Sequence, residues 1–415
     1  MSNQRQDTAP PVVETPYALL TLRKREERRL RAGHLWVFSN EVDTRTTSLK
    51  DFAPGDPVTV VGSSGRFLGH GYVNPRSLIA ARVLSRDPGV LPNEALLGAR
   101  LRQAVALREG WLRQARWGRL VHGEGDLLPG LVVDRFDDLL VGQVTTAGMA
   151  RWQDTLAHLL RDIVPGVKAL RWANDTAVRD LEGLPRESCM GFGELPDQLT
   201  VEEGDARFEL PGGGGQKTGW YYDQRRNRER LLPMIQPGHR VLDVFSYVGA
   251  WGIRAALAGA GPVTCVDSSA PALAAVAHNA ALNGVEVQAR QGDAAGVLKA
   301  LAGEGQRFDV IVLDPPALIP RRKDIEAGTK AYWQLNELAM RLLADDGLLV
   351  SCSCSHHLTE ESLLRVVAGC ARHQHRDLQV LMRGEQAPDH PVHPAIEQSR
   401  YLKALYCRVS ARKNP

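Results

Sequence analysis

The sequence predicts a multidomain α/β protein with a small β-barrel first, an α+β module in the middle and a mostly parallel sheet at the end. The chain has 415 residues, which is too long for one typical domain. Short apolar strands broken by turns fill residues 17–87. From residue 240 onward strands alternate with helices, and runs such as DVIVLD are typical of a parallel sheet buried on both faces.

The composition is that of an ordinary globular protein, with 43% hydrophobic and 24% charged residues. A formal net charge of +3 neither requires nor excludes nucleic acid as a partner. The sequence has no apolar run long enough for a bilayer and no signal-type segment, so we expect no membrane association. Six cysteines are spread through the chain, which indicates the reducing cytoplasm and no disulfide framework.

The first predicted domain, residues 17–90, follows a polar tail of residues 1–16 that we expect to be disordered. Its strand candidates are ALLTL, HLWVFS, PVTVV, FLGHGYV and LIAARVL, with Pro-Gly-Asp and Gly-Ser-Ser-Gly turns between them. A basic run separates the first two strands and includes Arg23, Lys24, Arg28, Arg29 and Arg31. This run is either a solvated face or a stripe that faces phosphates, where each neutralised phosphate adds salt-dependent affinity.

Residues 91–205 are predicted to form a compact α+β module. The expected elements are a helix at 93–109, strands at 119–122, 131–135 and 139–144, a helix at 151–163 and a strand at 169–172. The acidic segment HGEGD at 122–126, together with Asp134, could form a site. Acidic residues flanked by glycine between strands are more typical of turns, and we favour that interpretation.

The last predicted domain, residues 206–415, is entered through a Gly-rich stretch and the segment QKTGWYYDQRR. Asp223 is placed to cap a helix that carries Arg225 and Arg226. The expected strands are 240–245, 262–266, 285–290, 309–313 and 347–353. A helix is expected after the first strand and ends at residue 259, and three further helices are expected at 270–283, 331–344 and 359–373. Strand signals at 378–382 and 401–409 predict an antiparallel finish to the sheet.

The segment RVLDVFSYVGAWG at 240–252 is a strand, a turn and the start of a helix, which places backbone N–H groups where a ligand can sit. Its glycines are too few for a dinucleotide fingerprint, and Phe245 and Tyr247 replace two glycines of a methyltransferase pattern. Later strand ends carry Asp267, suited to ribose hydroxyls, Asp293, suited to an adenine amino group, and Asp314. Because these ends converge on one cleft, the set favours S-adenosylmethionine over a nicotinamide.

The segment GLLVSCSCS at 347–355 is a strand running into a turn, with Cys354 expected beside Asp314. C5 of a pyrimidine is a poor nucleophile, but addition of a thiolate at C6 pushes electron density onto C5. Asp314 can hydrogen-bond the N3/N4 edge of a cytosine and stabilise the charge that develops. The pattern therefore suggests a reason for a thiol at position 354.

Two competing interpretations apply to this segment. Cysteine is among the residues most often buried, and Cys352 is predicted to be a core residue. Cys352, Cys354, His356 and His357 also resemble a metal cluster. Structural zinc sites usually take ligands from two knuckles, and no second knuckle stands out, so we predict no metal.

The motifs FSYVGAWG, VLDPPAL and SCSCSHH, with QKTGWYYDQR upstream, resemble those of bacterial large-subunit (23S) ribosomal RNA (cytosine-5)-methyltransferases with an N-terminal PUA domain. The resemblance covers residues 17–409. It implies a PUA-type RNA-binding barrel, a middle α+β domain, a Rossmann-like class I methyltransferase domain that uses S-adenosylmethionine, and a homodimer. It implies Cys354 as the nucleophile, with Asp314 beside it. The implied cofactor residues are Asp243, Phe245, Ser246, Tyr247, Gly249, Asp267, Ser268, Asp293, Asp314 and Lys217.

One position departs from related enzymes. Ala317 stands where many RNA (cytosine-5)-methyltransferases have a second cysteine that helps release product, so the base that removes the C5 proton is unassigned. DNA cytosine methyltransferases take their nucleophile from a Pro-Cys pair at this motif, so Pro316-Ala317 argues against DNA.

The expected partner is therefore ribosomal RNA. The predicted RNA-binding residues are Arg23, Lys24, Arg28, Arg29, Arg31, Arg225, Arg226, Arg321, Arg322 and Lys323. Two other functions remain open from the residues. One is an N-methyltransferase in which the DPP motif grips an exocyclic amine, and the other is an RNA-binding assembly factor without catalytic activity.

Overall fold

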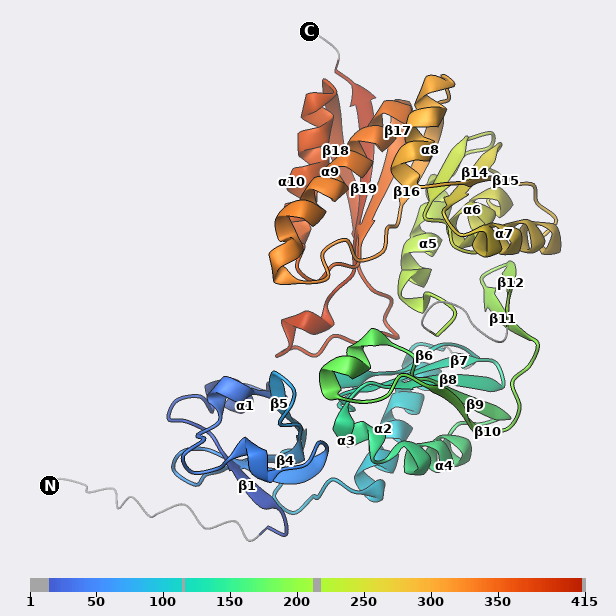
Figure 1. Ribbon diagram of the computed structural model, residues 1–415. Helices are drawn as coiled ribbons and strands as arrows, with labels where there is room; N and C mark the ends of the chain where they lie inside the picture. The colour runs from blue at the N-terminus through green and yellow to red at the C-terminus, as the bar shows by residue number, and fades with distance from the viewer. Residues whose placement is uncertain (1–14, 114–115, 212–217, 413–415) are drawn as a thin grey trace, which may run out of the picture. The chain divides into compact units, whose positions relative to one another are not determined.

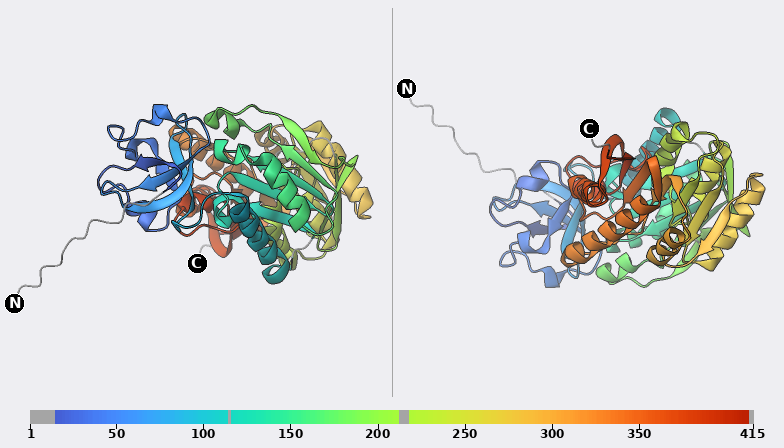
Figure 2. Two further views of the ribbon diagram at one scale, coloured as in Figure 1. Left: turned by 90° about the horizontal axis from the view of Figure 1, so that it is seen from below. Right: turned by 90° about the horizontal axis from the view of Figure 1, so that it is seen from above.

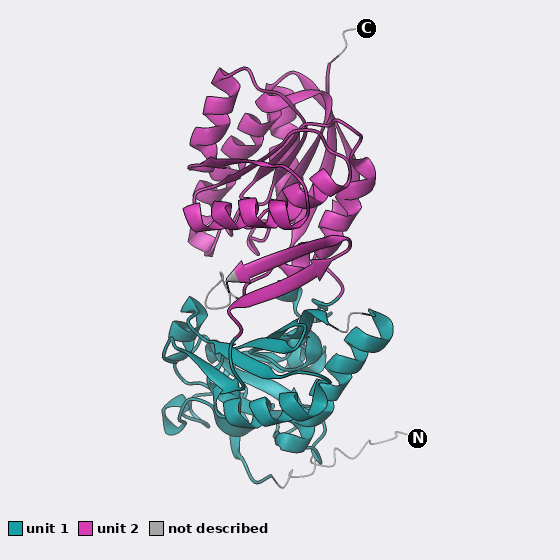
Figure 3. Ribbon diagram, turned by 90° about the vertical axis from the view of Figure 1, so that its right-hand side faces the viewer, with its two compact units in different colours: residues 1–195, 216–218, 389–399 teal, residues 196–215, 219–388, 400–415 magenta. Residues whose placement is uncertain are grey.

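The computed structural model describes residues 15–113, 116–211 and 218–412, and the chain divides into two compact units (Figure 1, Figure 3). The first unit comprises residues 1–195, 216–218 and 389–399, and the second comprises 196–215, 219–388 and 400–415. The predicted tail lies outside the described residues up to position 14. The three-domain division at 90 and 205 stays a prediction.

The first sheet of the first unit has the strand order β1-β3-β4-β5-β2. Its strands are β1 (Ala18–Thr21), β2 (Trp36–Phe38), β3 (Asp56–Val61), β4 (Phe67–Val73) and β5 (Ile79–Ser85). β1 and β3 are parallel and the other neighbours are antiparallel. A bridge between Leu22 and Val42 links the segments that follow the two edge strands, as a barrel requires. All five predicted strands are confirmed.

The second sheet of the first unit has the order β10-β9-β8-β7-β6. Its strands are β6 (Trp117–His122), β7 (Leu131–Phe136), β8 (Leu139–Val144), β9 (Ala169–Ala173) and β10 (Ser188–Phe192). The helices of this part are α2 (Glu94–Ala106), α3 (Ala147–Ala150) and α4 (Gln153–Ile163). α2 and α4 contribute apolar residues such as Leu101 and Leu156 to the core on this sheet. The predicted elements are confirmed, and β10 is additional because its mostly exposed residues show no apolar alternation.

The second unit contains a hairpin, β11 (Gln198–Glu203) with β12 (Ala206–Pro211), and a sheet of order β15-β14-β13-β16-β17-β19-β18. The strands of the large sheet are β13 (Val241–Val244), β14 (Val263–Asp267), β15 (Gln288–Gln291), β16 (Phe308–Leu313), β17 (Leu343–Ser353), β18 (Arg376–Gly384) and β19 (Lys403–Ala411). The pairs from β15 to β17 are parallel, and β19 pairs antiparallel with β17 and β18. The predicted antiparallel finish is confirmed.

Helices cover both faces of this sheet (Figure 1, Figure 2). One face packs against α8 (Ala294–Gly303), α9 (Ile325–Leu342) and α10 (Glu360–His373) through residues such as Leu242. The other packs against α5 (Arg225–Leu231), α6 (Ala250–Leu257) and α7 (Ala270–Leu282) through residues such as Val241. Successive strand residues point to opposite faces, so both faces need apolar side chains. Within the described residues, no helix has the length and apolar character needed to cross a bilayer.

Four features of the second unit differ from the predictions. The hairpin and α8 were not predicted, although the Asp293 carboxylate accepts the Gly296 N–H at 3.0 Å and so caps α8. α9 begins at Ile325, six residues before the predicted helix. The predicted cap at Asp223 is wrong, because its carboxylate instead accepts a hydrogen bond of 2.7 Å from the Tyr401 hydroxyl.

Candidate active site

The turn between β13 and α6 has an unusual backbone. Phe245 (φ 67°), Tyr247 (φ 51°) and Gly249 (φ 87°) all adopt left-handed conformations, which are uncommon for residues with side chains and are concentrated at functional sites. The Phe245 and Ser246 N–H groups donate to the Val266 carbonyl, at 2.9 and 3.0 Å, and the Tyr247 N–H donates to Asp267. These three N–H groups therefore fix the turn to β14 instead of pointing at a ligand, which corrects the prediction for them.

Asp243 lies under this turn and is completely buried. Its Oδ2 accepts the Gly252 N–H at 2.9 Å, which ties β13 to the first turn of α6. Oδ1 is also buried and has no hydrogen-bond partner within the described part of the chain. Burial raises the pKa of Asp243 to about 7. An unpaired acceptor at this depth is compatible with a polar ligand group at the turn.

Asp267 ends β14 with both carboxylate oxygens fixed by main-chain donors. Oδ2 accepts the Tyr247 N–H and Oδ1 accepts the Ser269 N–H, each at 2.9 Å. Each oxygen keeps a lone pair that can accept a further hydrogen bond, as two ribose hydroxyls would require. Ser268, the next residue, is exposed. Asp293 is also exposed and caps α8 through Oδ2, while Lys217 lies outside the described residues.

Asp314 follows β16 and is held by two side chains from the α5–α6 region. Gln224 Nε2 donates to Oδ1 at 2.8 Å, and Trp251 Nε1 donates to Oδ2 at 3.0 Å. Burial raises the pKa of Asp314 to about 6, and Asp223 adds to the rise, while the hydrogen bonds from Trp251 and Gln224 oppose it. The carboxyl group is therefore orientated and can exist in either protonation state near neutral pH.

Cys354 lies in the turn that follows β17, half-buried, with its Sγ 3.9 Å from the carbonyl oxygen of Pro315. Pro315 follows Asp314 directly, so the fold brings the SCSCS and DPP segments together as predicted. Cys352, two residues earlier, is completely buried in the core, as predicted, and burial raises the pKa of its thiol well above the usual value. The two cysteines thus have different environments. The described residues contain no group of three or more histidine, cysteine or acidic side chains arranged to hold a metal ion.

Sequence reasoning missed three residues of this site. Gln224 and Trp251 hold Asp314, and Lys403 donates to the carbonyl oxygen of Ser355 at 2.7 Å. Gln224 and Trp251 lie in the QKTGWYYDQR and FSYVGAWG motifs, but no spacing signal links them to Asp314 or Lys403 to Ser355, because these contacts join segments that are 90, 63 and 48 residues apart.

The predicted RNA-binding residues occur in both units and differ in exposure. In and before α1 (Arg28–Arg31), the side chains of Arg23, Lys24, Arg28 and Arg31 are exposed, whereas Arg29 pairs with Glu41 at 2.6 Å. In the second unit Arg226, Arg321, Arg322 and Lys323 are exposed, with Arg226 and Arg321 in ion pairs with Glu229 and Asp324. The side chain of Arg225 is only 13% exposed and lies 4.0 Å from Glu203.

The acidic segment of the first unit is structural, as favoured from the sequence. Asp126 pairs with Arg108 at 2.5 Å, and Asp134 pairs with Arg119 at 2.5 Å. Glu124 accepts a hydrogen bond of 2.8 Å from the Trp36 indole. Each of the three carboxylates therefore has a partner within this unit.

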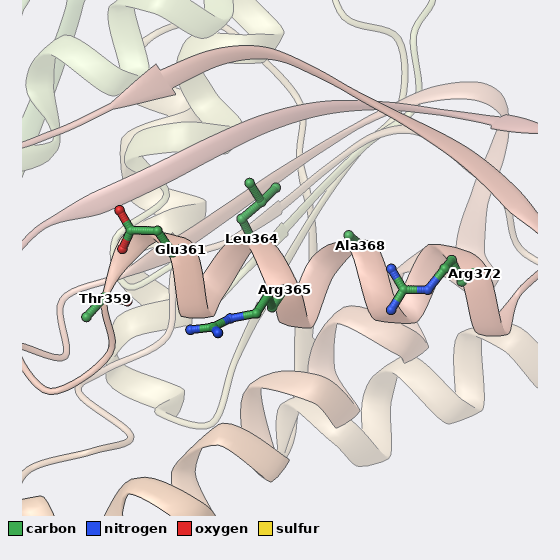
Figure 4. A pocket seen from close by; sticks show the side chains of 6 residues that line it. All are labelled: Thr359, Glu361, Leu364, Arg365, Ala368 and Arg372. Carbon is green, nitrogen blue, oxygen red and sulfur yellow. The ribbon is translucent and has the colours of Figure 1, made fainter.

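A pocket on the outer side of α10 is separate from these residues (Figure 4). Its lining residues are Thr359, Glu361, Leu364, Arg365, Ala368 and Arg372. It contains one acidic and two basic side chains, and none of the predicted site residues lines it. The candidate site is therefore the carboxyl edge of the sheet, where Asp243 lies near the end of β13, Asp267 ends β14, and Asp314 and Cys354 directly follow β16 and β17.

Two family models match different parts of the chain. Residues 20–86 match the family model of a PUA-like domain, and residues 224–333 match the model named conserved hypothetical protein 95. The chain is 36% identical to ribosomal RNA large subunit methyltransferase I of Shewanella denitrificans, over 94% of this chain and 99% of the relative. It is 34% identical to the protein of the same name from Cronobacter sakazakii, with the same coverage.

Two solved structures resemble this structure over 94% of this chain and all of their own length. One is a candidate SAM-dependent methyltransferase from Streptococcus mutans, with a TM-score of 0.80 and 20% identity. The other is a candidate methyltransferase complexed with SAH, with a TM-score of 0.81 and 20% identity. At this identity the likeness establishes the methyltransferase fold alone, and the PUA-like domain rests on the family model that matches residues 20–86.

Proposed function

The chain belongs to the family of ribosomal RNA large subunit methyltransferase I, and we propose that it methylates C5 of a cytosine in 23S ribosomal RNA through a cysteine adduct. The broader activity follows from the family: the protein is an S-adenosylmethionine-dependent methyltransferase of large-subunit ribosomal RNA. The position on the base and the thiol chemistry are the proposal.

The observation that carries the proposal is the position of Cys354. Its thiol lies at the carboxyl end of β17, against the carbonyl of the residue that follows Asp314. Methylation of an exocyclic nitrogen needs a group that grips the amine and has no use for a thiol there. Methylation at C5 needs a nucleophile at C6, because C5 is not nucleophilic in the intact aromatic ring.

The proposed steps use groups of this chain. The Cys354 thiolate forms a bond to C6, and the electron pair of the C5–C6 double bond becomes available at C5. Asp314 in its protonated form, orientated by Gln224 and Trp251, donates a hydrogen bond to N3 and accepts one from the N4 amino group, which stabilises the negative charge that develops on the ring. After methylation a base removes the C5 proton, the double bond re-forms and the thiolate leaves. The side chain of Ala317 cannot act as this base.

The residues at the carboxyl edge fit the cofactor. The fixed carboxylate of Asp267 would accept from both ribose hydroxyls, Asp293 would accept from the adenine amino group, and the turn with Asp243 beneath it would surround the remaining groups. The other proposed contacts are Gly249 and Ser268, together with groups of Phe245, Ser246 and Tyr247 other than their N–H groups, which are used within the fold. When bound, S-adenosylmethionine supplies a methyl group activated by a positively charged sulfur.

Asp267→Ala is expected to weaken the binding of S-adenosylmethionine by roughly 10- to 100-fold, because hydrogen bonds to a charged acceptor contribute about 1.5–3 kcal/mol. Isothermal titration calorimetry measures this affinity directly. Asp309→Ala is the matched control, since Asp309 lies near the amino end of β16 and pairs with Arg240. Equal affinity in the Asp267 variant and the unaltered protein would remove this residue from the cofactor site.

We further propose that exposed basic residues contact ribosomal RNA phosphates. They are Arg23, Lys24, Arg28 and Arg31 of the first unit and Arg226, Arg321, Arg322 and Lys323 of the second. Arg225 contributes less because its side chain is only 13% exposed, and Arg29 contributes less because it is held by the buried carboxylate of Glu41. The homodimer implied by the resemblance stays a prediction.

The proposed reaction is tested by the product. Purified protein, methyl-labelled S-adenosylmethionine and 23S ribosomal RNA from a strain lacking the enzyme are incubated, and the RNA is digested to nucleosides for mass spectrometry. We expect the label in 5-methylcytidine. Label in N4-methylcytidine would favour the exocyclic-amine reaction, and no label in any nucleoside would contradict catalysis.

A further inference from the structure

Lys403 places a buried ammonium group beside the turn that carries Cys354. It is the first residue of β19 and lies opposite Ser353 of β17 in the antiparallel register. The residue is 7% exposed, and its Nζ donates to the carbonyl oxygens of Ser355 at 2.7 Å and Tyr401 at 2.8 Å. The ammonium group is therefore fastened to the residue that directly follows Cys354.

This buried cation has only neutral hydrogen-bond partners. Among the described residues no carboxylate forms an ion pair with Lys403, and both of its acceptors are backbone carbonyls. A buried charge without a counter-charge is costly. Burial lowers the pKa of Lys403 to about 8, and Cys354 is the strongest opposing influence. A negative charge on Cys354 would thus compensate the buried cation.

A second set of contacts fixes the same turn from the opposite side. Ser355 Oγ accepts the Ile319 N–H at 3.1 Å and is 3.0 Å from the Tyr332 hydroxyl. Ser353 Oγ donates to the same hydroxyl at 2.9 Å. The residues on both sides of Cys354 are therefore fixed. The hydroxyl groups of Ser353 and Ser355 bind Tyr332 and the segment after the DPP motif, and Lys403 of β19 binds the carbonyl oxygen of Ser355.

We infer that Lys403 is a positioning residue that stabilises the thiolate form of Cys354 and fixes the turn that presents it. This inference rests on the proposed function, in which Cys354 attacks C6. The S–H bond breaks and its proton passes to solvent, while Lys403 keeps its own proton and provides the counter-charge. The sulfur electron pair is then free to form the bond to carbon.

Other titratable groups from neighbouring elements act on Lys403 and Cys354. The acidic groups among them disfavour a thiolate at Cys354, so the positive charge of Lys403 has to exceed their effect. Asp314 lies before the proline that contacts Cys354, and Glu360 at the start of α10 acts on Lys403. Tyr221, Tyr332 and Cys352 act on the pair from the side of Cys354 and Arg400 acts on Lys403, while His356 and His357 follow Cys354 closely in sequence.

The test measures the alkylation rate of Cys354 by iodoacetamide against pH in the full chain without RNA or cofactor, with peptide mass spectrometry separating the cysteines. In the unaltered protein we expect the midpoint for Cys354 to lie below that for exposed Cys189. In Lys403→Met we expect the Cys354 midpoint to rise by about one pH unit, with alkylation at pH 7 about tenfold slower. Lys403→Arg keeps the charge and should keep the low midpoint.

Arg376→Met is the matched control. Arg376 also donates to backbone carbonyls of the β17 region, including Leu343 at 3.0 Å, but at the opposite end of that strand. This variant should leave the alkylation profile of Cys354 unchanged, and thermal unfolding monitors its folding and that of the Lys403 variants. If Lys403→Met does not fold, the alkylation midpoints of Cys354 and Cys189 in the unaltered protein still test whether the thiolate of Cys354 is stabilised.

Equal midpoints for Cys354 and Cys189, or a Cys354 profile unchanged in Lys403→Met, would overturn the role of Lys403 even if the RNA product is 5-methylcytidine. A low midpoint that depends on Lys403, combined with label in another nucleoside, would support the ion pair and contradict the C5 reaction. The two proposals can therefore fail separately.

Discussion

Cys354→Ala is expected to lower methyl transfer to ribosomal RNA by on the order of 10⁴-fold or more, the scale seen when a covalent nucleophile is removed. Without the thiol the proposed adduct at C6 cannot form, and C5 stays unreactive. The binding of S-adenosylmethionine should remain, because Cys354 is not among its proposed contacts. Tritium transfer from labelled S-adenosylmethionine measures the activity, and calorimetry measures the binding.

Cys352→Ala is the control for that experiment. Cys352 lies two residues before Cys354, inside β17, and is completely buried among core residues. Its replacement should cost about 1 kcal/mol of stability through lost packing and leave most of the activity. If Cys354→Ala keeps activity close to that of Cys352→Ala, the enzyme uses no thiol adduct, and methylation of an exocyclic nitrogen becomes the better account.

Glu203→Gln is expected to lower the free energy of unfolding by about 3–5 kcal/mol, because it removes the single negative charge from a buried cluster. Glu203, the last residue of β11, binds Arg228 through both oxygens, at 2.7 and 2.6 Å, and Arg254 at 2.8 Å. Burial alone would raise the pKa of Glu203, but Arg228, Arg225 and Arg254 outweigh it and lower the pKa. The substitution leaves two buried guanidinium groups without a counter-charge.

Urea-induced unfolding of the full chain measures this loss, and hydrogen exchange of amides in β11, α5 and α6 assigns it to the cluster. Glu229→Gln is the matched control, because Glu229 pairs with Arg226 on the exposed side of α5, with both side chains about half exposed. That change should cost about 0.5 kcal/mol or less. Equal losses for the two variants would mean that the Glu203 cluster does not stabilise the second unit.

The parts of the site that could be predicted from the sequence depend on local pattern. Asp267 and Asp314 were placed correctly because each directly follows or ends an apolar strand, and parallel strands end at one edge. Cys352 and Cys354 could be separated because one lies inside the strand and the other after it. The apolar pattern of a strand predicts where the strand ends, and this prediction requires no tertiary contacts.

The parts that could not be predicted depend on contacts between distant segments. Asp223 has the sequence position of a helix cap, yet its carboxylate bonds to Tyr401, which is 178 residues away. The N–H groups of Phe245 and Tyr247 were expected to face a ligand, but the strand that follows uses them. Lys403 opposes Ser353 only through the antiparallel pairing of β19 with β17, and neither segment alone indicates this register.

The most direct test of the thiol adduct uses a 23S ribosomal RNA fragment containing 5-fluorocytidine. Fluorine at C5 cannot leave as a proton does, so after methylation the bond from sulfur to C6 cannot be released. With S-adenosylmethionine present, we predict a protein–RNA complex that survives denaturing electrophoresis and maps to Cys354 by peptide mass spectrometry. Absence of a covalent complex with fluorinated RNA, while unmodified RNA is methylated normally, would contradict the account.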